Sequence, residues 1–332
     1  MRVGIISFAH GHANGNAQCL ARLPDVELVA IADDDETRLR AAVARFGGEA
    51  YGDYRQLLAR TDVDAVIVTS PNAQHAEHVI AAAAAGKHVL CEKPIATSRS
   101  DGQAMVAACR EHGVKLQTAF PVRFGAPAVS LRGLVREGAI GTPVAVKATN
   151  PGSYPGGWFG DPKLAGGGAV MDHTVHVVDL LRWIFDAEVT HVYAEIDTRL
   201  HAGLPVDDVA TVMLTLSNGL FASLDPSWSR PKTWPIWGGL TLEVIGDRGV
   251  VSMDAFGQNV QLVEDRGPSH RFVPWAEGGD LAMIRGFLDA VRDDTDPPVT
   301  GEDGLRALEV ALCAYESAKR GEPVPCPDAL AG

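Results

Sequence analysis

The first 120 residues alternate short apolar runs with helical patterns, and this alternation is the feature that most constrains the fold. The apolar runs are typical of buried strands, and apolar residues recur at helical spacing in the segments between them. Strands are predicted at 2–7, 27–32, 65–69, 88–91 and 115–119, and helices at 12–22, 36–46, 53–60, 73–85 and 99–112. This rhythm with short connections predicts an α/β fold with a parallel, doubly wound sheet.

After about residue 122 the pattern becomes typical of an open sheet with a few helices. A helix is predicted at 127–137, a strand at 144–149, a loop rich in Gly, Pro and aromatic residues at 150–168, and a helix at 169–185. Alternating apolar positions then predict strands at 189–197, 208–216, 219–226, 239–245, 249–253 and 259–263, followed by helices at 280–292 and 302–319. Turn-forming residues between these strands favour a largely antiparallel sheet. We therefore expect two domains, 1–122 and 123–332.

Composition restricts the classes of protein to which the chain can belong. Its 332 residues are 46% hydrophobic and 21% charged, which is typical of a globular protein with more than one domain. A net charge of −13 argues against a duplex-binding protein, which needs a basic face. No apolar run reaches membrane-spanning length, and no basic leader precedes the first strand. Five cysteines without a Cys-x-x-Cys pair favour free thiols, so we expect a cytoplasmic protein that binds neither nucleic acid nor membrane.

The turn after the first predicted strand stands where a dinucleotide-binding loop belongs. In the pattern G-x-G-x-x-G the glycines permit a tight turn and a close backbone approach to a diphosphate. This chain has Ser7, Ala9 and His12 at those positions. Ser7 and Ala9 are small enough for the turn, whereas His12 is a clear departure. The residues predicted to form the cofactor loop are Ser7, Phe8, Ala9, His10, Gly11 and His12.

Asp33 ends the second predicted strand about twenty residues past this turn. A carboxylate there accepts hydrogen bonds from the adenosine ribose of a dinucleotide. Asp34 and Asp35 follow it and no arginine is adjacent in the sequence, so repulsion of a 2′-phosphate favours NAD over NADP. The alternative interpretation is a capping cluster for the helix that starts near Glu36. Both can hold, with Asp35 as the cap.

The run Cys91-Glu92-Lys93-Pro94 ends a fourth apolar strand in a lysine followed by proline. Proline disfavours helical geometry at the residue before it, so Lys93 is expected to be extended at the carboxyl end of a parallel strand. Ligands of open α/β sheets bind at that edge, where an ammonium group can be removed from water. The alternative is a solvated lysine at a strand end. The third strand ends at the same edge in Ser70-Pro71-Asn72. By itself this sequence is mostly typical of a turn.

The predicted helix at 169–185 carries a polar stripe. Asp172, His176 and Asp179 fall on one narrow face of the helix, with His173 beside it, while apolar residues cover the other faces. Buried carboxylates and imidazoles need partners, so the stripe indicates either a catalytic group or a satisfied core pair. A metal site built from Asp172, His173 and His176 with His10 or His12 is a further alternative, although no metal is expected because His173 points away from the stripe.

These motifs together are similar to those of one enzyme family. The motifs that recur in order are Val-Gly-Ile-Ile at the start, Thr69-Ser70-Pro71-Asn72 with His75, residues 85–94, Gly-Gly-Gly-x-x-x-Asp172-x-x-x-His176-x-x-Asp179, and residues 300–305. The chain resembles the Gfo/Idh/MocA oxidoreductases, the glucose–fructose oxidoreductase and inositol dehydrogenase family. The resemblance covers essentially residues 1–325.

The resemblance implies an NAD-dependent dehydrogenase with an N-terminal Rossmann domain and a C-terminal domain for substrate binding and oligomerisation. Lys93, Asp172 and His176 look like the catalytic trio of the family, and Glu92 is similar to its cofactor-contacting glutamate. The remaining cofactor contacts implied by motif position are Ser70, Pro71, Asn72, His75 and Lys93. The large open sheet commonly joins copies in this family, so a homodimer or homotetramer is expected.

The implied substrate is a sugar, a sugar derivative or a cyclitol that exchanges a hydride between a secondary hydroxyl and nicotinamide. His176 would accept the hydroxyl proton, Lys93 would stabilise alkoxide character, and Asp172 would bind a neighbouring hydroxyl. Side chains near these motifs that suit substrate binding are Arg123, Asn150, Tyr154, Trp158, His173 and Trp234. Packing in a sheet face or an oligomer interface explains the tryptophans equally well.

Two other functions are open to such a chain. The first is a glycosidase that uses NAD transiently, oxidising C3 of the sugar and eliminating the aglycone, as some relatives do. The second is a non-catalytic sensor that binds dinucleotide or sugar and regulates a partner. The joint presence of Lys93, Asp172 and His176 argues against the sensor.

Overall fold

The computed structural model describes residues 1–236, 238–257, 259–263, 270–274 and 278–327. Within them the chain forms two compact units that interleave along the sequence. The first unit contains residues 1–121, 163–166 and 280–308, and the second contains 122–162, 167–279 and 309–332. The predicted single boundary at residue 122 differs from this division, because residues 163–166 and 280–308 belong to the first unit although they follow residue 122. No helix among the described residues is both long and apolar enough to cross a membrane.

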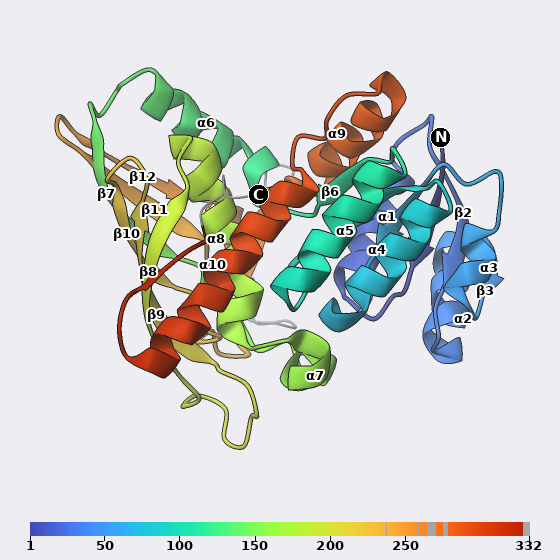
Figure 1. The fold of residues 1–332 in the computed structure, drawn as a ribbon, viewed down its shortest axis with the longest axis horizontal. Helices are drawn as coiled ribbons and strands as arrows, with labels where there is room; N and C mark the ends of the chain where they lie inside the picture. Colours follow the sequence, from blue (N-terminus) through green and yellow to red (C-terminus); the bar gives the residue numbers. More distant parts are fainter. Residues whose placement is uncertain (237, 258, 264–269, 275–277, 328–332) are drawn as a thin grey trace. The chain divides into compact units, whose positions relative to one another are not determined.

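The first unit is built on a six-stranded sheet whose strands are all parallel (Figure 1). The strand order is β3-β2-β1-β4-β5-β6. The strands are β1 (Arg2–Ile6), β2 (Glu27–Ala32), β3 (Glu49–Tyr51), β4 (Ala65–Val68), β5 (His88–Cys91) and β6 (Leu116–Thr118). The central strands are buried on both faces, as in the run Ala65-Val66-Ile67-Val68, so the predicted doubly wound sheet is confirmed.

Helices connect successive strands of this sheet. They are α1 (His12–Leu20), α2 (Glu36–Phe46), α3 (Tyr54–Leu58), the short η1 (Asn72–Gln74) with α4 (His75–Ala84), and α5 (Arg99–Glu111). Helix α9 (Asp280–Asp293) comes much later in the chain and packs against α1. Side-chain caps fix where two of them begin: the Asp35 carboxylate accepts from the Arg38 amide at 2.9 Å, and the Ser98 hydroxyl accepts from the Asp101 amide at 3.1 Å. The predicted capping role of Asp35 is therefore confirmed.

The strand order reverses at β1, between its neighbours β2 and β4. At such a switch point the loops after the carboxyl ends of the strands separate and leave a crevice for a ligand. The segments that follow β1, β2, β4 and β5 contain Ser7, Asp33, Ser70 and Lys93 respectively. The topology thus brings the polar residues singled out in the sequence to one edge of one sheet.

The second unit is built on a seven-stranded mixed sheet of order β12-β11-β7-β10-β9-β8-β15. Its strands are β7 (Pro143–Thr149), β8 (Val189–Asp197), β9 (Val209–Leu216), β10 (Phe221–Asp225), β11 (Thr241–Gly246), β12 (Val250–Asp254) and β15 (Val324–Pro325). Only the β7–β10 pair is parallel among these described strands, so the predicted, mostly antiparallel sheet is confirmed. Strands β13 (Asn259–Val263) and β14 (His270–Pro274) form a separate hairpin.

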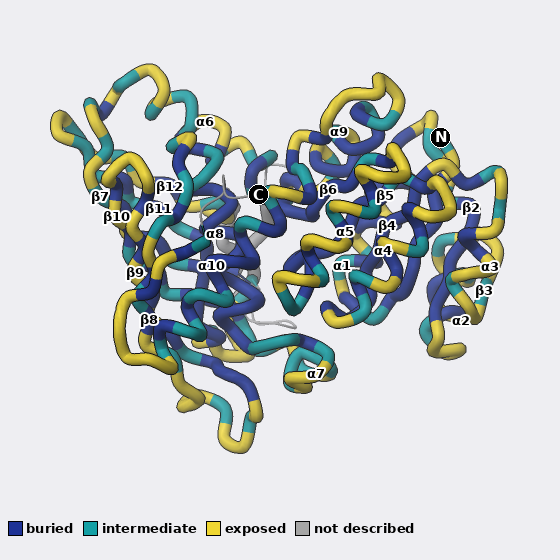
Figure 2. The backbone as a smooth tube through the Cα atoms, in the orientation of Figure 1, coloured by how far each residue is buried: buried dark blue, intermediate teal, exposed yellow. Residues whose placement is uncertain are grey.

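One face of this sheet is covered by helices. They are α6 (Ala126–Arg136) and α8 (Ala169–Phe185). The chain around them also forms the short η2 (Pro121–Phe124), η3 (Gly157–Gly160) and α7 (Pro162–Ala165), of which α7 lies almost wholly in the first unit. The long helix α10 (Gly301–Arg320) reaches β8 through Ser317, whose hydroxyl accepts from the Ala194 amide at 3.1 Å. Helix α8 is buried along most of its length (Figure 2), so the side chains of its polar stripe need polar partners other than bulk water.

Three strands are absent from the sequence-based prediction: β14 (His270–Pro274), which pairs with β13, and two shorter ones. Strand β3 has three residues, of which Glu49 and Ala50 are exposed, and β15 has two. Runs this short carry no periodicity that can be recognised in a sequence. The other strand and helix bounds differ from the predicted ones by at most a few residues, as is usual at element ends.

Candidate active site

The loop after β1 keeps the geometry of a glycine-rich turn without its glycines. Ser7 has φ of +71°, a left-handed conformation that favours glycine. Two hydrogen bonds hold it there: its hydroxyl accepts from the Ala9 amide at 3.1 Å, and its carbonyl accepts from the Thr69 hydroxyl. Small side chains at positions 7 and 9 therefore do permit the tight turn that the sequence predicts.

Asp33 lies at the end of β2 with its carboxylate buried. It accepts hydrogen bonds from the amides of Phe8 at 2.6 Å and Asp35 at 2.8 Å. The guanidinium of Arg38 also reaches it, with NH2 at 2.8 Å from Oδ1 and Nε at 3.2 Å from both oxygens. Asp33 therefore joins the loop after β1 to the start of α2, as the ribose-binding carboxylate of a dinucleotide site would.

The contact with Arg38 corrects one premise taken from the sequence. No arginine is adjacent to Asp33 in the chain, but the first turn of α2 brings Arg38 back onto it in space. The same guanidinium pairs with Asp34 at 2.9 Å and lies 3.6 Å from Asp35. One positive group thus faces three carboxylates, so the local charge stays negative even though the premise was wrong.

Glu92, at the end of β5, is 2% exposed and faces the loop after β1. Its Oε1 lies 3.2 Å from Nδ1 of His12, and its Oε2 accepts from the Lys93 amide at 3.2 Å. Burial by itself would raise the pKa of Glu92, but the positive charges of His12, His10 and Lys93 lower it well below its usual range. Partial removal from water would lower the pKa of His12, but the charge and hydrogen bond of Glu92 raise it above its ordinary value of 6.5.

Lys93 is 1% exposed, so the solvated strand end considered from the sequence is not what the structure shows. The segment around it is fixed by His75, whose Nδ1 lies 3.0 Å from the Pro94 carbonyl oxygen and whose Nε2 lies 3.0 Å from that of Ser70. Asn72, in the same turn, donates to the Ala165 carbonyl at 2.9 Å. Ser70, Pro71, Asn72 and His75 are all buried, and the contacts seen for Asn72 and His75 are with the protein backbone.

In the second unit, the start of helix α8 is fixed by two residues that are distant in sequence. The Asp207 carboxylate accepts from the amides of Gly168 and Val170, both at 2.8 Å, and from the Tyr315 hydroxyl at 2.7 Å. A Cβ on Gly168 would lie 1.8 Å from the Asp207 backbone oxygen, so only glycine fits there. Burial and the Asp207 carboxylate raise the pKa of Tyr315, so its phenol stays protonated as a donor.

Asp172, in the first turn of α8, is 3% exposed and held from two sides. The indole Nε1 of Trp228 donates to its Oδ2 at 3.1 Å, and Nε2 of His173 lies 3.1 Å from the same oxygen. His173 is fully buried, with Nδ1 at 2.9 Å from the Pro226 carbonyl, and its own carbonyl accepts from the Asn150 amide group at 3.0 Å. These contacts fix the His173 ring beside Asp172.

His176 and Asp179 continue the polar stripe on α8, one and two turns beyond Asp172. His176 is 5% exposed. The Asp179 carboxylate binds the guanidinium of Arg123 through two hydrogen bonds, one of them from Nε at 2.9 Å, and both side chains are buried. The fork of Arg123, predicted to bind substrate, is therefore engaged by Asp179, and a substrate role for it stays a prediction.

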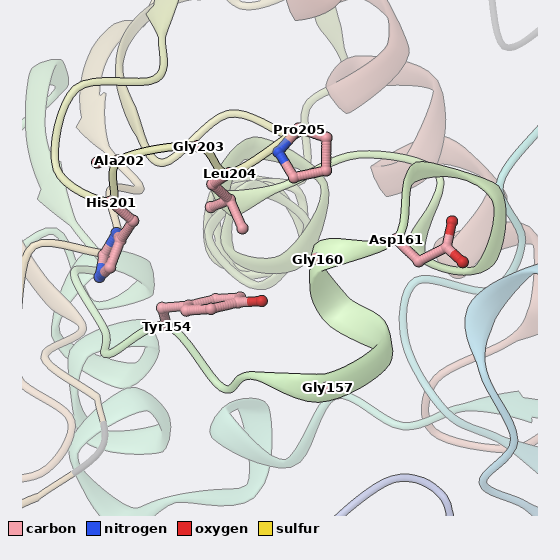
Figure 3. Close-up of a pocket in the computed structure, with 9 residues that line it drawn as sticks. All are labelled: Tyr154, Gly157, Gly160, Asp161, His201, Ala202, Gly203, Leu204 and Pro205. Carbon is pink, nitrogen blue, oxygen red and sulfur yellow. The ribbon is translucent and has the colours of Figure 1, made fainter.

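The second unit also contains a hollow of about 390 Å³, lined by Tyr154 and by residues 201–205 (Figure 3). The Tyr154 ring forms one wall, Leu204 and Pro205 lie opposite, and His201 and Asp161 stand at the two ends (Figure 3). The Tyr154 ring packs on the Trp228 indole with centroids 5.1 Å apart. One aromatic contact therefore separates the hollow from the indole that holds Asp172.

The tryptophans predicted to bind substrate, Trp158 and Trp234, contact other side chains. Trp158 stacks on Phe159 with ring centroids 3.9 Å apart, and Trp234 is 38% exposed with the Arg230 guanidinium 4.0 Å above its ring. Neither shows a contact to Asp172 among the described interactions. Their predicted substrate roles stay predictions.

Comparison with known proteins shows where the chain belongs. Residues 1–120 match the family model described as an oxidoreductase family with an NAD-binding Rossmann fold, and residues 129–252 match the GFO/IDH/MocA C-terminal domain. The chain belongs to the Gfo/Idh/MocA oxidoreductases. The family resemblance seen in the motifs is thereby confirmed.

Members of the Gfo/Idh/MocA family named as sugar and inositol enzymes are similar to the whole chain. Myo-inositol 2-dehydrogenase of Thermotoga maritima is 31% identical, covering 96% of both chains, and 1,5-anhydro-D-fructose reductase of Ensifer adhaerens is 31% identical, covering 83% of both. The crystal structure of GenD2 from gentamicin A biosynthesis in complex with NAD superposes with a TM-score of 0.91 at 28% identity, covering 99% of this chain and 97% of that one. The protein is thus an NAD-binding oxidoreductase of sugar or inositol dehydrogenase type.

Several residues of this Gfo/Idh/MocA site could not be assigned from the sequence. Asp207 and Tyr315 lie far from α8 in the chain, and nothing in their local patterns marks them as caps. Trp228 was visible as one of several tryptophans, but its hydrogen bond to Asp172 was not. Among the described residues, the metal-compatible group is His10, His12 and Glu92, with ligand atoms within 4.8 Å of one another, rather than the group centred on Asp172.

Proposed function

We propose that this protein is an NAD-dependent dehydrogenase that oxidises a secondary hydroxyl of a sugar, a sugar derivative or a cyclitol. The observation that carries the proposal is the buried Asp172 carboxylate, which accepts from the Trp228 indole and has Nε2 of His173 3.1 Å away, one helical turn before His176. A buried carboxylate held by its neighbours on one oxygen suits a polyol, because vicinal hydroxyls donate to a carboxylate. The dehydrogenase names of similar proteins support the same substrate class.

Each catalytic side chain has a role that its chemistry supports. His176 accepts the proton of the reacting hydroxyl, since a buried imidazole is the side chain best suited to move protons near neutral pH. Lys93, whose ammonium group is almost fully removed from water, stabilises the developing alkoxide. Asp172 binds a neighbouring hydroxyl and fixes the orientation of the substrate. The bound nicotinamide supplies the hydride chemistry.

We assign the hollow beside Tyr154 to the part of the substrate that does not react. Its volume of about 390 Å³ is that of a small-ligand pocket. The flat Tyr154 ring suits the apolar face of a sugar ring, while His201 and Asp161 offer polar partners at its ends. Replacing Tyr154 by alanine should raise KM with a smaller effect on kcat, because the contact is made equally in the ground and transition states.

The charge around Asp33 supports NAD as the cofactor. Three carboxylates faced by one guanidinium leave a net negative charge where NADP carries its 2′-phosphate. A panel of polyols and sugars, followed by NADH absorbance with NAD and with NADP, tests both the substrate class and this preference. Release of an aglycone without net NADH would instead indicate a glycosidase, and tight NADH binding with no turnover across the panel would indicate a sensor.

The catalytic roles are tested by Lys93→Ala and His176→Ala. Each should lower turnover by about a hundredfold or more while NADH binding, followed by fluorescence, persists. Lys319→Ala and His112→Ala, at exposed positions, are matched controls that should leave both quantities unchanged. Near-normal turnover in either active-site variant would contradict the assignment.

We also propose that the face of the second sheet opposite α8 binds a second copy of the chain. Strand register aligns Val250, Ile245, Ala145 and Phe221 in one row across β12, β11, β7 and β10. Val250 is 57% exposed and Phe221 52%, an unusual exposure for large apolar residues in one row. Light scattering should give a dimer or tetramer for the wild type and a smaller species for Phe221→Glu. A monomeric wild type would contradict the proposal.

A further inference from the structure

The cofactor loop after β1 has few backbone amides left to offer a diphosphate. A glycine-rich loop binds phosphate through amides that point at the ligand. Here six of the seven amides from residue 8 to residue 14 donate within the protein. They are those of Phe8 to Asp33, Ala9 to Ser7, His10 to Thr69, His12 to His10, Ala13 to His10, and Asn14 to Gly11. Because so few amides are available, a charged side chain is needed to bind the diphosphate.

His12 stands at the position where the dinucleotide pattern places its third glycine. Its side chain is 41% exposed, so the ring can reach a ligand, while the carboxylate it faces is almost completely buried. The Nδ1 atom lies 3.2 Å from Oε1 of Glu92. With Nδ1 committed to Glu92, the ring presents Nε2 as its second N–H donor when it is protonated.

The groups around His12 favour a positive ring. Glu92 faces it from the end of β5 and Asp280 from the start of α9, whereas the positive charge of Lys93 opposes protonation. The His10 ring lies beside it at an interplanar angle of 57°, with ring centroids 4.2 Å apart. The Nδ1 of His10 accepts from the His12 amide at 3.1 Å, so its lone pair is already used, and a metal held by both histidines would have to break that bond.

We propose that His12, held as an imidazolium by Glu92, binds the diphosphate of the dinucleotide in place of the backbone amides of a glycine-rich loop. The inference rests on the proposed function, since it requires that the protein binds a dinucleotide. It accounts for two otherwise separate facts, the replacement of a fingerprint glycine by histidine and the loss of loop amides to internal hydrogen bonds. It also makes His12 a determinant of cofactor affinity.

The consequence is a dinucleotide affinity that depends on pH. Glu92 raises the pKa of His12, so the ring is charged below that raised value and neutral above it. Affinity for NADH should therefore be highest at low pH and fall as the pH rises through the raised pKa, above the ordinary value of 6.5. A charge-assisted hydrogen bond to phosphate corresponds to about a tenfold change in the dissociation constant.

The test is a fluorescence titration of the full-length protein with NADH between about pH 6 and about pH 9. The wild-type Kd should rise about tenfold over this range. His12→Gln, which keeps a polar side chain but no charge, should bind about tenfold more weakly at low pH and lose the dependence. His112→Gln, at an exposed position on the same unit, is the matched control and should behave as the wild type.

Two further measurements separate this role from a merely structural one. Asp280→Asn leaves His12 in place but removes a carboxylate that faces it, so the midpoint of the pH dependence should move to lower pH. ADP-ribose, which has the diphosphate but no nicotinamide, should show the same dependence as NADH, whereas adenosine should show none.

Each result bears on the proposal separately from the dehydrogenase assignment. NADH binding that is independent of pH in the wild type, or a dependence that survives in His12→Gln, would overturn the role of His12 while leaving the dehydrogenase intact. So would a dependence for NADH that ADP-ribose lacks, or one equivalent of zinc in the purified protein that His12→Gln loses. Failure to bind NADH at any pH would instead remove the proposed function itself.

Discussion

Glu92 in the first unit and Asp172 in the second are two buried carboxylates that face a histidine at nearly the same distance. Glu92 Oε1 lies 3.2 Å from His12, and Asp172 Oδ2 lies 3.1 Å from His173. The histidines differ: the side chain of His12 is 41% exposed, whereas that of His173 is fully buried. The same pair of groups is thus built once at a surface and once in a core.

The difference in exposure separates two tasks. His12 can exchange protons with solvent and meet a ligand, so its pair with Glu92 suits reversible binding of an anion. His173 spans from Asp172 to the Pro226 carbonyl, and Trp228 holds the same oxygen of Asp172, so this pair suits the fixed geometry that a reacting centre needs. Six variants test the two sites, from the largest expected effect to the smallest.

The two carboxylates themselves give the largest effects. Asp172→Asn should lower kcat by about a hundredfold or more with little change in the NADH Kd, because the amide no longer accepts from a substrate hydroxyl on both oxygens. Glu92→Gln should raise the NADH Kd about tenfold, because it removes the charge that holds His12 protonated. Stopped-flow turnover and fluorescence titration measure the two quantities. If both variants change kcat, or both change the NADH Kd, by the same factor, the two carboxylates do not have separate tasks.

Trp228→Phe removes the indole N–H that holds Asp172 but keeps an aromatic ring next to Tyr154. The free energy of unfolding should fall by about 1–2 kcal/mol, because a buried carboxylate oxygen loses a donor. kcat should fall about tenfold as Asp172 loses its fixed orientation. Urea denaturation and steady-state kinetics give both values. Trp183→Phe, on α8 where Arg132 lies 4.3 Å above the ring, is the control and should leave kcat unchanged.

Arg38→Ala tests the charge balance around Asp33. Loss of the guanidinium leaves three carboxylates unopposed, so the preference for NAD over NADP should increase about threefold to fivefold. The effect is modest because the Arg38 side chain is 37% exposed and screened by water. Competition binding with both dinucleotides measures the ratio. Arg40→Ala, whose partner Glu36 is exposed, should leave the ratio unchanged. An equal change of the ratio in Arg40→Ala would show that the effect does not come from the charges around Asp33.

The smallest effects concern backbone strain near the two sites. Ser7, in the cofactor loop, and Asp186, which ends α8, both have positive φ, +71° and +47°. Replacement by glycine relieves this conformation, but each change also loses a side-chain contact, Ser7 with the Ala9 amide and Asp186 with Arg136. The free energy of unfolding should rise by about 0.5 kcal/mol in each variant. A fall of that size in thermal unfolding experiments would show that the lost contact outweighs the strain.

The sequence predicted the elements well because the patterns are long and regular. The apolar runs of β1, β2, β4 and β5 and the caps at Asp35 and Ser98 are local signals, so their bounds follow from a few neighbouring residues. Strand β3, with exposed Glu49 and Ala50, has no such signal. The sequence also does not show that residues 280–308 belong to the first unit, because α9 has the same amphipathic pattern as any helix that packs on a core.

The site was predictable in its residue types but not in its pairings. The sequence singled out Asp33, Glu92, Lys93 and Asp172, which are all buried as functional groups would be. Arg38 on Asp33, Asp207 on α8 and Trp228 on Asp172 are contacts between residues that need the fold to meet. A sequence shows which charges exist, whereas only the packing shows which of them neutralise one another.

The interleaving of the two units has a consequence for how the protein is made. The Gln117 side chain donates to the Met283 carbonyl at 3.2 Å, the Thr118 hydroxyl donates to the Thr300 carbonyl at 3.3 Å, and α9 packs against α1. A nascent chain that ends near residue 122 therefore lacks the partners of β6 and leaves one side of α1 uncovered. The dinucleotide-binding half should complete its folding only after about nine-tenths of the polypeptide has left the ribosome, so it is among the last parts of the molecule to become resistant to proteases.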